Sequence, residues 1–241
     1  MLDAGSSAAH ARSVLTGLEA EGVAPPSLVM LSHSHWDHVF GAAELGVPVV
    51  AHTRTAEYLT GIAKLDWSDG ALERRLAAGE VTQFHVDNVK QELPAPRDVT
   101  VAPADIVFDG SLTFELGDVR VQALQIANDH TDDGCVMFVE PDRVLFVGDA
   151  ICESPAGGFT MGLAFPLLDA LLAFAAEHVV EGHNDTVMSP TQFEELAGKI
   201  RRAGALVERL GPDEAAILAE LGEPQDKDTR DIVRAFVAGR A

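Results

Sequence analysis

The sequence predicts an α/β (α+β) fold on three observations. The spacing of apolar residues alternates along the chain between the two-residue period of strands and the 3.6-residue period of helices. The stretch from Val99 to Val147 has a β pattern that is interrupted by the turn pairs Gly117-Asp118 and Pro141-Asp142. The 241 residues, of which 47% are hydrophobic, are enough to bury the core of one large domain.

The first third of the chain alternates between predicted helices and short buried strands. A helix over 8–20 carries Val14, Leu15 and Leu18 on one side and ends before Gly22. The next elements are a strand at 27–31, a polar segment at 32–38, a helix at 39–45, a strand at 48–51 and a helical stretch over 55–78 that is broken around 66–70.

Two hairpins and a run of helices follow. The hairpins pair 112–116 with 119–124 and 136–139 with 144–147, before a helix at 167–176, a strand at 179–180 and helices after 191, at 212–221 and at 228–237. Thr191 and Glu194 form a capping box for the first of these last helices. We expect a main domain over 1–191 and a helical extension over 192–241, packed on that domain or lying at a homodimer interface.

The charge and the cysteine content narrow the class of protein. Seventeen basic and 38 acidic residues give a net charge of −21, which disfavours nucleic acids and anionic membranes as partners but leaves a small-molecule substrate open. The two cysteines, Cys135 and Cys152, are too few for a disulfide framework. Residues 1–10 lack the features of a signal peptide, so a cytoplasmic protein is expected.

Four potential metal ligands lie within six residues, directly after a predicted buried strand. They are His33, His35, Asp37 and His38. Imidazole and carboxylate groups suit zinc, iron and related divalent ions. Solvated loop histidines are the alternative, but four ligands gathered in a chain with nine histidines favour a metal site.

Three further candidate ligands each follow a predicted strand. His130 follows 124–129, Asp149 follows 144–148, and His183 follows 179–182. Each alone could be an ordinary loop residue, whereas strand ends are where α/β folds gather ligands from distant parts of the chain.

The run from His33 to His38 resembles the H-x-H-x-D-H signature of the metallo-β-lactamase superfamily. His130-Thr131, Val147-Gly148-Asp149 and Gly182-His183 resemble the later motifs of that family in the expected order, and Leu2-Asp3-Ala4-Gly5 resembles its first motif. The resemblance implies a four-layer αββα sandwich over 1–191 with a catalytic site at one edge of its sheets.

The resemblance also implies a binuclear metal site. His33, His35 and His130 would hold the first ion, Asp37, His38 and His183 the second, and Asp149 would bridge the two. Zinc is the expected metal, with iron and manganese as alternatives. A hydroxide that bridges the metals would attack the substrate, and Asp37 would orient this nucleophile and relay protons.

The chain departs from the family pattern in three places. It begins at the first motif, which implies a shortened N-terminus or a sheet without its N-terminal edge strands. Next to His130-Thr131 the chain has three acidic residues, Asp129, Asp132 and Asp133. These acids either orient the imidazole rings of the ligands or are solvated charges of the loop. Asn184 follows His183 where many relatives have glycine.

We therefore expect a hydrolase that cleaves an ester, thioester, lactone or amide bond of a small molecule. A mononuclear iron dioxygenase and a non-catalytic binding protein of the same fold are the alternatives. Phe159, Met161 and Phe165 line a substrate pocket or belong to the core. Cys152, the lone Tyr58, and the histidines at 10, 52, 85 and 178 are read as packing, surface or structural residues. A glutathione-thioester substrate would need cations, for which Lys199, Arg201 and Arg202 are the candidates.

Overall fold

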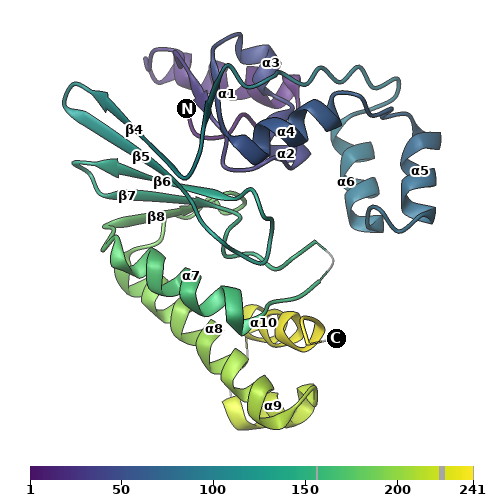
Figure 1. Cartoon of the computed structure of the whole chain (residues 1–241), viewed down its shortest axis with the longest axis vertical. Coiled ribbons are helices and arrows are strands. Elements are labelled where there is room, and N and C mark those ends of the chain that lie inside the picture. The colour runs from purple at the N-terminus through teal and green to yellow at the C-terminus, as the bar shows by residue number, and fades with distance from the viewer. Residues whose placement is uncertain (156, 223–225, 241) are drawn as a thin grey trace. The chain divides into compact units, whose positions relative to one another are not determined.

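A computed structural model describes residues 1–155, 157–222 and 226–240 (Figure 1). The chain divides into two compact units, Met1–Gly110 and Ser111–Ala241. This division falls inside the predicted main domain, and the proposed boundary at residue 191 stays a prediction.

The first unit is built on a parallel sheet in the order β1-β2-β3. Its strands are β1 (Val29–Met30), β2 (Val49–His52) and β3 (Ile106–Phe108). Its helices are α1 (Ala8–Ala20), α2 (Trp36–Val39), α3 (Ala42–Leu45), α4 (Thr53–Ile62), α5 (Asp69–Ala77) and α6 (Gln83–Glu92). All residues of β1 and β2 are buried, as the continuous apolar runs predict. A single parallel bridge from Leu2 to Met30 extends the sheet at the β1 edge.

The second unit is built on a sheet in the order β4-β5-β6-β7-β8. Its strands are β4 (Ser111–Leu116), β5 (Val119–Gln125), β6 (Cys135–Glu140), β7 (Val144–Gly148) and β8 (His178–Glu181). The pairs β4–β5 and β6–β7 are antiparallel hairpins, so both predicted hairpins are confirmed. Because β5–β6 is also antiparallel and β7–β8 is parallel, β5, β7 and β8 run in the same direction. Their carboxyl ends therefore meet at one edge of the sheet.

Four helices complete the second unit. They are α7 (Met161–Ala173), α8 (Pro190–Leu210), α9 (Glu214–Leu221) and α10 (Lys227–Ala238). Helices α7 and α8 lie side by side along the sheet, and α8 also contacts α9 and α10 (Figure 1). A core that includes Val147, Leu168, Ile200 and Phe236 fills the space between these helices and the strands.

Two sequence-based predictions of local structure need correction, and one helix was missed. The capping box of α8 is formed by Ser189 and Gln192, two residues before the predicted pair, because Pro190 takes the first helical position. Helix α7 begins at Met161 and includes Pro166, whereas the prediction started it at residue 167. Helix α6 was not predicted, because it buries only Val86 and Val89 and has a weak apolar period. None of the helices in the described part of the chain is long and apolar enough to cross a bilayer.

Candidate metal site

The ligand cluster of the first unit lies directly after strand β1. The chain leaves β1 at Met30, and His35 becomes the N-cap residue of the short helix α2. The rings of His33 and His35 are 4.5 Å apart between centroids, and those of His33 and His38 are 4.1 Å apart. The pairs His33–His35, His33–His38 and Asp37–His38 each bring potential ligand atoms within 4.8 Å of one another. The four predicted residues therefore form one compact cluster.

Asp3, which belongs to the first motif Leu2-Asp3-Ala4-Gly5, holds this cluster in place through hydrogen bonds. Its Oδ1 accepts from the Ser32 backbone N–H at 2.6 Å, and its Oδ2 accepts from the Ser32 hydroxyl at 2.7 Å. The same Oδ2 accepts from His38 Nδ1 at 2.8 Å. The Asp3 backbone N–H donates to the Met30 carbonyl, which keeps the first-motif loop beside β1.

These hydrogen bonds select the ring tautomers of His33 and His38. A carboxylate oxygen only accepts, so in the neutral ring the proton of His38 lies on Nδ1. The single hydroxyl proton of Ser32 goes to Asp3, so the Ser32 oxygen accepts from Nδ1 of His33 at 2.9 Å. Both imidazoles then present the lone pair of Nε2, which is the state a metal ligand needs.

The second unit brings together the three remaining predicted ligands. His130 lies on the loop after β5, Asp149 follows β7 and His183 follows β8, all at the carboxyl ends of strands that run in the same direction. Asp149 Oδ2 is 3.4 Å from His130 Nε2 and 3.0 Å from His183 Nε2. The backbone bond from Gly182 N–H to the Gly148 carbonyl, 2.9 Å long, holds the ends of β7 and β8 together.

The loop that carries His130 is braced by its own polar residues. Nδ1 of His130 donates to the Glu153 carbonyl at 3.0 Å, so Nε2 again presents the lone pair. Asp133 is completely buried and accepts from the Thr131 hydroxyl, and Asp129 accepts from the Thr160 hydroxyl at 2.8 Å. Asp129 and Asp133 therefore shape this loop, whereas Asp132 is exposed.

Cys152 is close to this ligand set but unsuited to nucleophilic chemistry. Burial, and then the negative charges of Asp149, Glu181 and Glu153, raise the pKa of its thiol well above the ordinary value. Cys135 and Cys152 are not joined by a disulfide bond.

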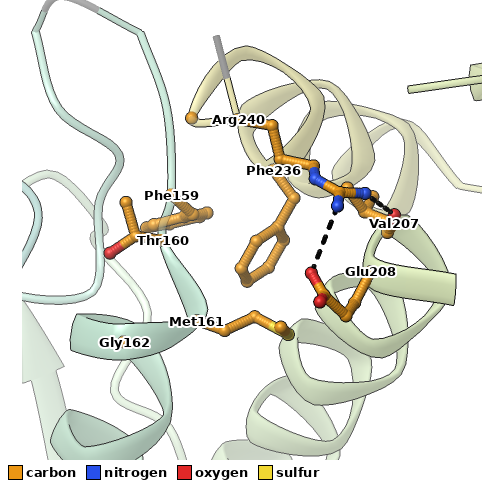
Figure 2. A pocket seen from close by; sticks show the side chains of 10 residues that line it. Phe159, Thr160, Met161, Gly162, Val207, Glu208, Phe236 and Arg240 are labelled. Atoms are coloured by element: carbon orange, nitrogen blue, oxygen red, sulfur yellow. Dashed lines mark hydrogen bonds and ion pairs between the residues drawn. The ribbon is translucent and has the colours of Figure 1, made fainter. Parts of the chain in front are cut away.

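A pocket of about 210 Å³ lies within the second unit where the start of α7 meets α8 and α10 (Figure 2). Phe159, Met161 and Phe236 line it, and Arg240 forms an ion pair with Glu208 at 3.4 Å beside it. Phe159 is also a core residue and Met161 packs against the same core, so the core alternative holds for both, and a role in substrate binding stays a prediction. Phe165, the third residue predicted to line a pocket, packs against Phe236 at 6.4 Å between ring centroids.

The chain belongs to the metallo-β-lactamase superfamily, whose family model matches residues 1–206. Among solved structures, a metallo-β-lactamase family protein from Thermus thermophilus is 20% identical, with a TM-score of 0.59 over 98% of this chain and 81% of that one. A metallo-β-lactamase from Pontibacter korlensis is 18% identical, with a TM-score of 0.52 over 81% of this chain and 79% of that one.

A double mutant of the sec-alkyl sulfatase PisA1 is 16% identical, with a TM-score of 0.61 over 98% of this chain and 44% of that one. No curated protein matches the chain. The fold class predicted from the sequence, the αββα metallo-β-lactamase sandwich, is thereby confirmed. At these identities, the likeness to solved structures shows the fold alone.

Proposed function

We propose that this protein is a metal-dependent hydrolase in which the ligand sets of the two units act on one pair of divalent ions. His33, His35 and His130 would hold one ion, Asp37, His38 and His183 the other, and Asp149 would contact both. Membership of the metallo-β-lactamase superfamily and the complete set of seven ligand residues support this proposal. Zinc is the expected metal, because imidazole and carboxylate ligands suit it.

The main support for the proposal is that two hydrogen-bond acceptor atoms lie close together in the second unit. Because Nδ1 of His130 carries the ring proton, Nε2 of His130 is an acceptor. This atom lies 3.4 Å from Asp149 Oδ2, which is also an acceptor. In the first unit, Nε2 of His38 faces Asp37 Oδ2 at 3.8 Å in the same way. Two acceptors that face one another repel unless a cation or a proton lies between them. A divalent cation suits both places.

The chain's own residues prepare this site for hydrolysis. Asp3 and Ser32 hold His33 and His38 in the tautomer that binds metal, and the Glu153 carbonyl does the same for His130. When bound, the metal ions would polarise the substrate carbonyl and lower the pKa of water to about 7. Asp37 would orient the nucleophile and relay protons.

The substrate class is a small molecule with an ester, thioester, lactone or amide bond. A glutathione thioester is disfavoured, because Lys199 is paired with Asp226 at 2.8 Å and Arg201 with Asp169 at 2.5 Å. The acidic balance of the chain again argues against a nucleic-acid substrate. A homodimer and a cytoplasmic location stay predictions.

The mononuclear iron dioxygenase and the non-catalytic binding protein remain the alternatives to a hydrolase. The complete ligand set argues against a protein that has lost its chemistry, since loss of one or two ligands would be expected of it. A sulfate ester joins the probes to be tested, because one similar structure is that of a sec-alkyl sulfatase.

The test is a hydrolysis screen of the purified full chain with ester, thioester, lactone, amide and secondary alkyl sulfate probes. We expect turnover of at least one carbonyl probe, its loss after chelation with dipicolinate, and its return with zinc. An Asp37→Asn variant should turn over at least about a hundredfold more slowly, because it loses both a carboxylate ligand of the second ion and the group that relays protons. Turnover that survives complete removal of metal would overturn the proposal.

A further inference from the structure

The pocket of about 210 Å³ in the second unit has apolar walls (Figure 2). Phe159 and Phe236 are almost completely buried, and their rings are 5.3 Å apart between centroids. Met161 lines the pocket from α7, and Val207 lines it from α8. An engineered apolar cavity of about 150 Å³ in another protein holds benzene. The pocket therefore has room for an aromatic ring with a short substituent.

Close backbone packing fixes the walls of this pocket. The Phe159 N–H donates to the carbonyl of Ala235, on α10, at 2.8 Å. A Cβ at Gly239 would lie 2.1 Å from the Phe159 carbonyl oxygen, so the end of α10 touches the segment before α7. At Gly162, by contrast, a Cβ would meet no atom of the described residues within 4 Å. The pocket is therefore a fixed frame with open space beside residue 162.

The charged residues among the described residues that line the pocket are paired with each other. The Arg240 guanidinium is 3.4 Å from a Glu208 carboxylate oxygen and also donates to the Val207 carbonyl (Figure 2). A charged ligand would have to lose hydration and compete with this pair, whereas an uncharged ligand would not. The pocket therefore favours an uncharged molecule with an aromatic ring or a short alkyl chain.

Thr160 connects this pocket to a proposed metal ligand. It lines the pocket and is the N-cap residue of α7. Its hydroxyl does not cap the helix but donates to Asp129 Oδ1 at 2.8 Å, and Figure 2 shows this hydroxyl turned away from Phe236. Asp129 directly precedes His130 in the chain. The seven proposed ligands, all of which the structure describes, are not among the lining residues, so the pocket is a separate site.

We propose that this pocket is an effector site, which binds an uncharged aromatic or short-chain alkyl molecule and thereby strengthens zinc binding. A molecule that holds Thr160 in place also holds Asp129 and the loop that carries His130. The coupling to zinc rests on the metal site of the proposed function, whereas the binding of the apolar molecule does not. Because coupling between two binding sites is reciprocal, zinc strengthens the binding of the apolar molecule by the same factor.

The first test measures binding of acetophenone to the isotope-labelled full chain by backbone amide NMR. Acetophenone is an uncharged aromatic ketone without a bond that a hydrolase cleaves. We expect it to shift the amide signals of lining residues such as Met161 and Gly204, with a Kd of about 1 mM or lower. Benzoate and benzylammonium, which have the same ring with a charge, should bind at least about tenfold more weakly. Shifts confined to other parts of the chain, or equal binding of the two ions, would overturn the inference.

Two variants that add bulk at the pocket test its place in the fold. Gly162→Leu and Met161→Trp should each bind acetophenone at least about tenfold more weakly. Gly198→Leu is the matched control, because Gly198 lies on α8 outside the lining set and a Cβ there also meets nothing within 4 Å among the described residues. It should bind acetophenone as the wild type does. Unchanged affinity in both pocket variants, with their folds intact by NMR, would overturn the inference.

The coupling is tested by zinc titration of the apoprotein with and without acetophenone at about ten times its Kd. We expect acetophenone to raise the zinc affinity of the wild type by about fivefold or more. Thr160→Val keeps the shape of the side chain but loses the hydrogen bond to Asp129, so it should bind acetophenone without this gain. A zinc affinity that acetophenone leaves unchanged in the wild type, or raises equally in Thr160→Val, would overturn the coupling.

These readouts separate the inference from the proposed function. If the wild type binds zinc and acetophenone cooperatively but hydrolyses no probe, the proposed function is wrong and the effector site stands. If the wild type hydrolyses a probe with its zinc but does not bind acetophenone, the inference is wrong and the proposed function stands.

Discussion

Asp3 is the residue on which the ligand geometry of the first unit depends most. Its backbone has φ of 55°, in the left-handed region that asparagine and aspartate tolerate better than other side chains. Its carboxylate receives three hydrogen bonds, from the Ser32 N–H, the Ser32 hydroxyl and His38 Nδ1. Backbone conformation and acceptor capacity together therefore favour aspartate at this position.

Replacement of Asp3 by asparagine should separate metal binding from folding. Asparagine accepts the left-handed conformation but turns an NH₂ group toward Ser32 and His38, so His38 is driven to carry its proton on Nε2. We expect a loss of zinc affinity of about tenfold to a hundredfold. Isothermal titration of the apoprotein with zinc measures this affinity. Asp3→Ala should lose as much zinc affinity and, in addition, about 1–3 kcal/mol of folding stability. Unchanged zinc affinity in Asp3→Asn would contradict the proposed tautomer control.

Cys152 should be chemically silent in the folded protein. Its raised pKa keeps the thiol protonated at pH 8, where a free cysteine is partly thiolate. We expect Ellman's reagent to react with neither thiol of the native protein within minutes, and with both Cys135 and Cys152 in guanidinium chloride. Rapid labelling of Cys152 under native conditions, assigned by mass spectrometry of the peptides, would contradict this prediction.

At the residue scale, sequence reasoning found the ligands but not the groups that orient them. His33, His35, Asp37 and His38 form a recognisable pattern because they are adjacent in the chain. The roles of Ser32 and the Glu153 carbonyl have no such signal, since they depend on hydrogen bonds that only the folded backbone creates. His85 was read as surface or structural, although its position beside Trp36 depends on a helix that the sequence did not predict.

At the scale of elements, the ends of strands explain where the ligands lie. His130, Asp149 and His183 follow β5, β7 and β8, which run in the same direction in one sheet. The hairpins and buried strands could be predicted, because tight turns and apolar runs are local signals. The weakly amphipathic α6 and the true cap of α8 could not, because packing and proline geometry decide them.

Gly41, between α2 and α3, should be intolerant of a side chain. A Cβ at this position would lie 2.0 Å from the carbonyl oxygen of Ala4, in the loop that carries Asp3. We expect Gly41→Ala to lose about 1–3 kcal/mol of stability and to bind zinc more weakly, because the loop must move. Urea unfolding and zinc titration measure the two effects.

Gly17→Ala, within the exposed face of α1, is the control for that substitution. Nothing lies within 4 Å of a Cβ at Gly17, and alanine is the better helix former, so this variant should gain about 0.5–1 kcal/mol. A Gly41→Ala protein as stable as the wild type would show that the first-motif loop adapts freely and does not fix Asp3.

At the scale of the whole molecule, each compact unit contributes a distinct part of the ligand set. The first unit carries His33, His35, Asp37 and His38, and the second carries His130, Asp149 and His183. Within each unit the ligands converge in the structure, while their joint action on one metal pair is the proposal. The family assignment could be made from the sequence, because its motifs are short and ordered. The substrate could not, because specificity depends on side chains from loops and helices outside those motifs.

The measurement that tests the central claim most directly is zinc per chain by elemental mass spectrometry, for the wild type and for Asp149→Ala and His35→Ala. We expect about two zinc ions in the wild type and about one in His35→Ala. Asp149→Ala should hold fewer than about one, because both ions lose a ligand. A wild type without stoichiometric metal, or an Asp149→Ala variant that keeps both ions, would contradict the seven-ligand assignment.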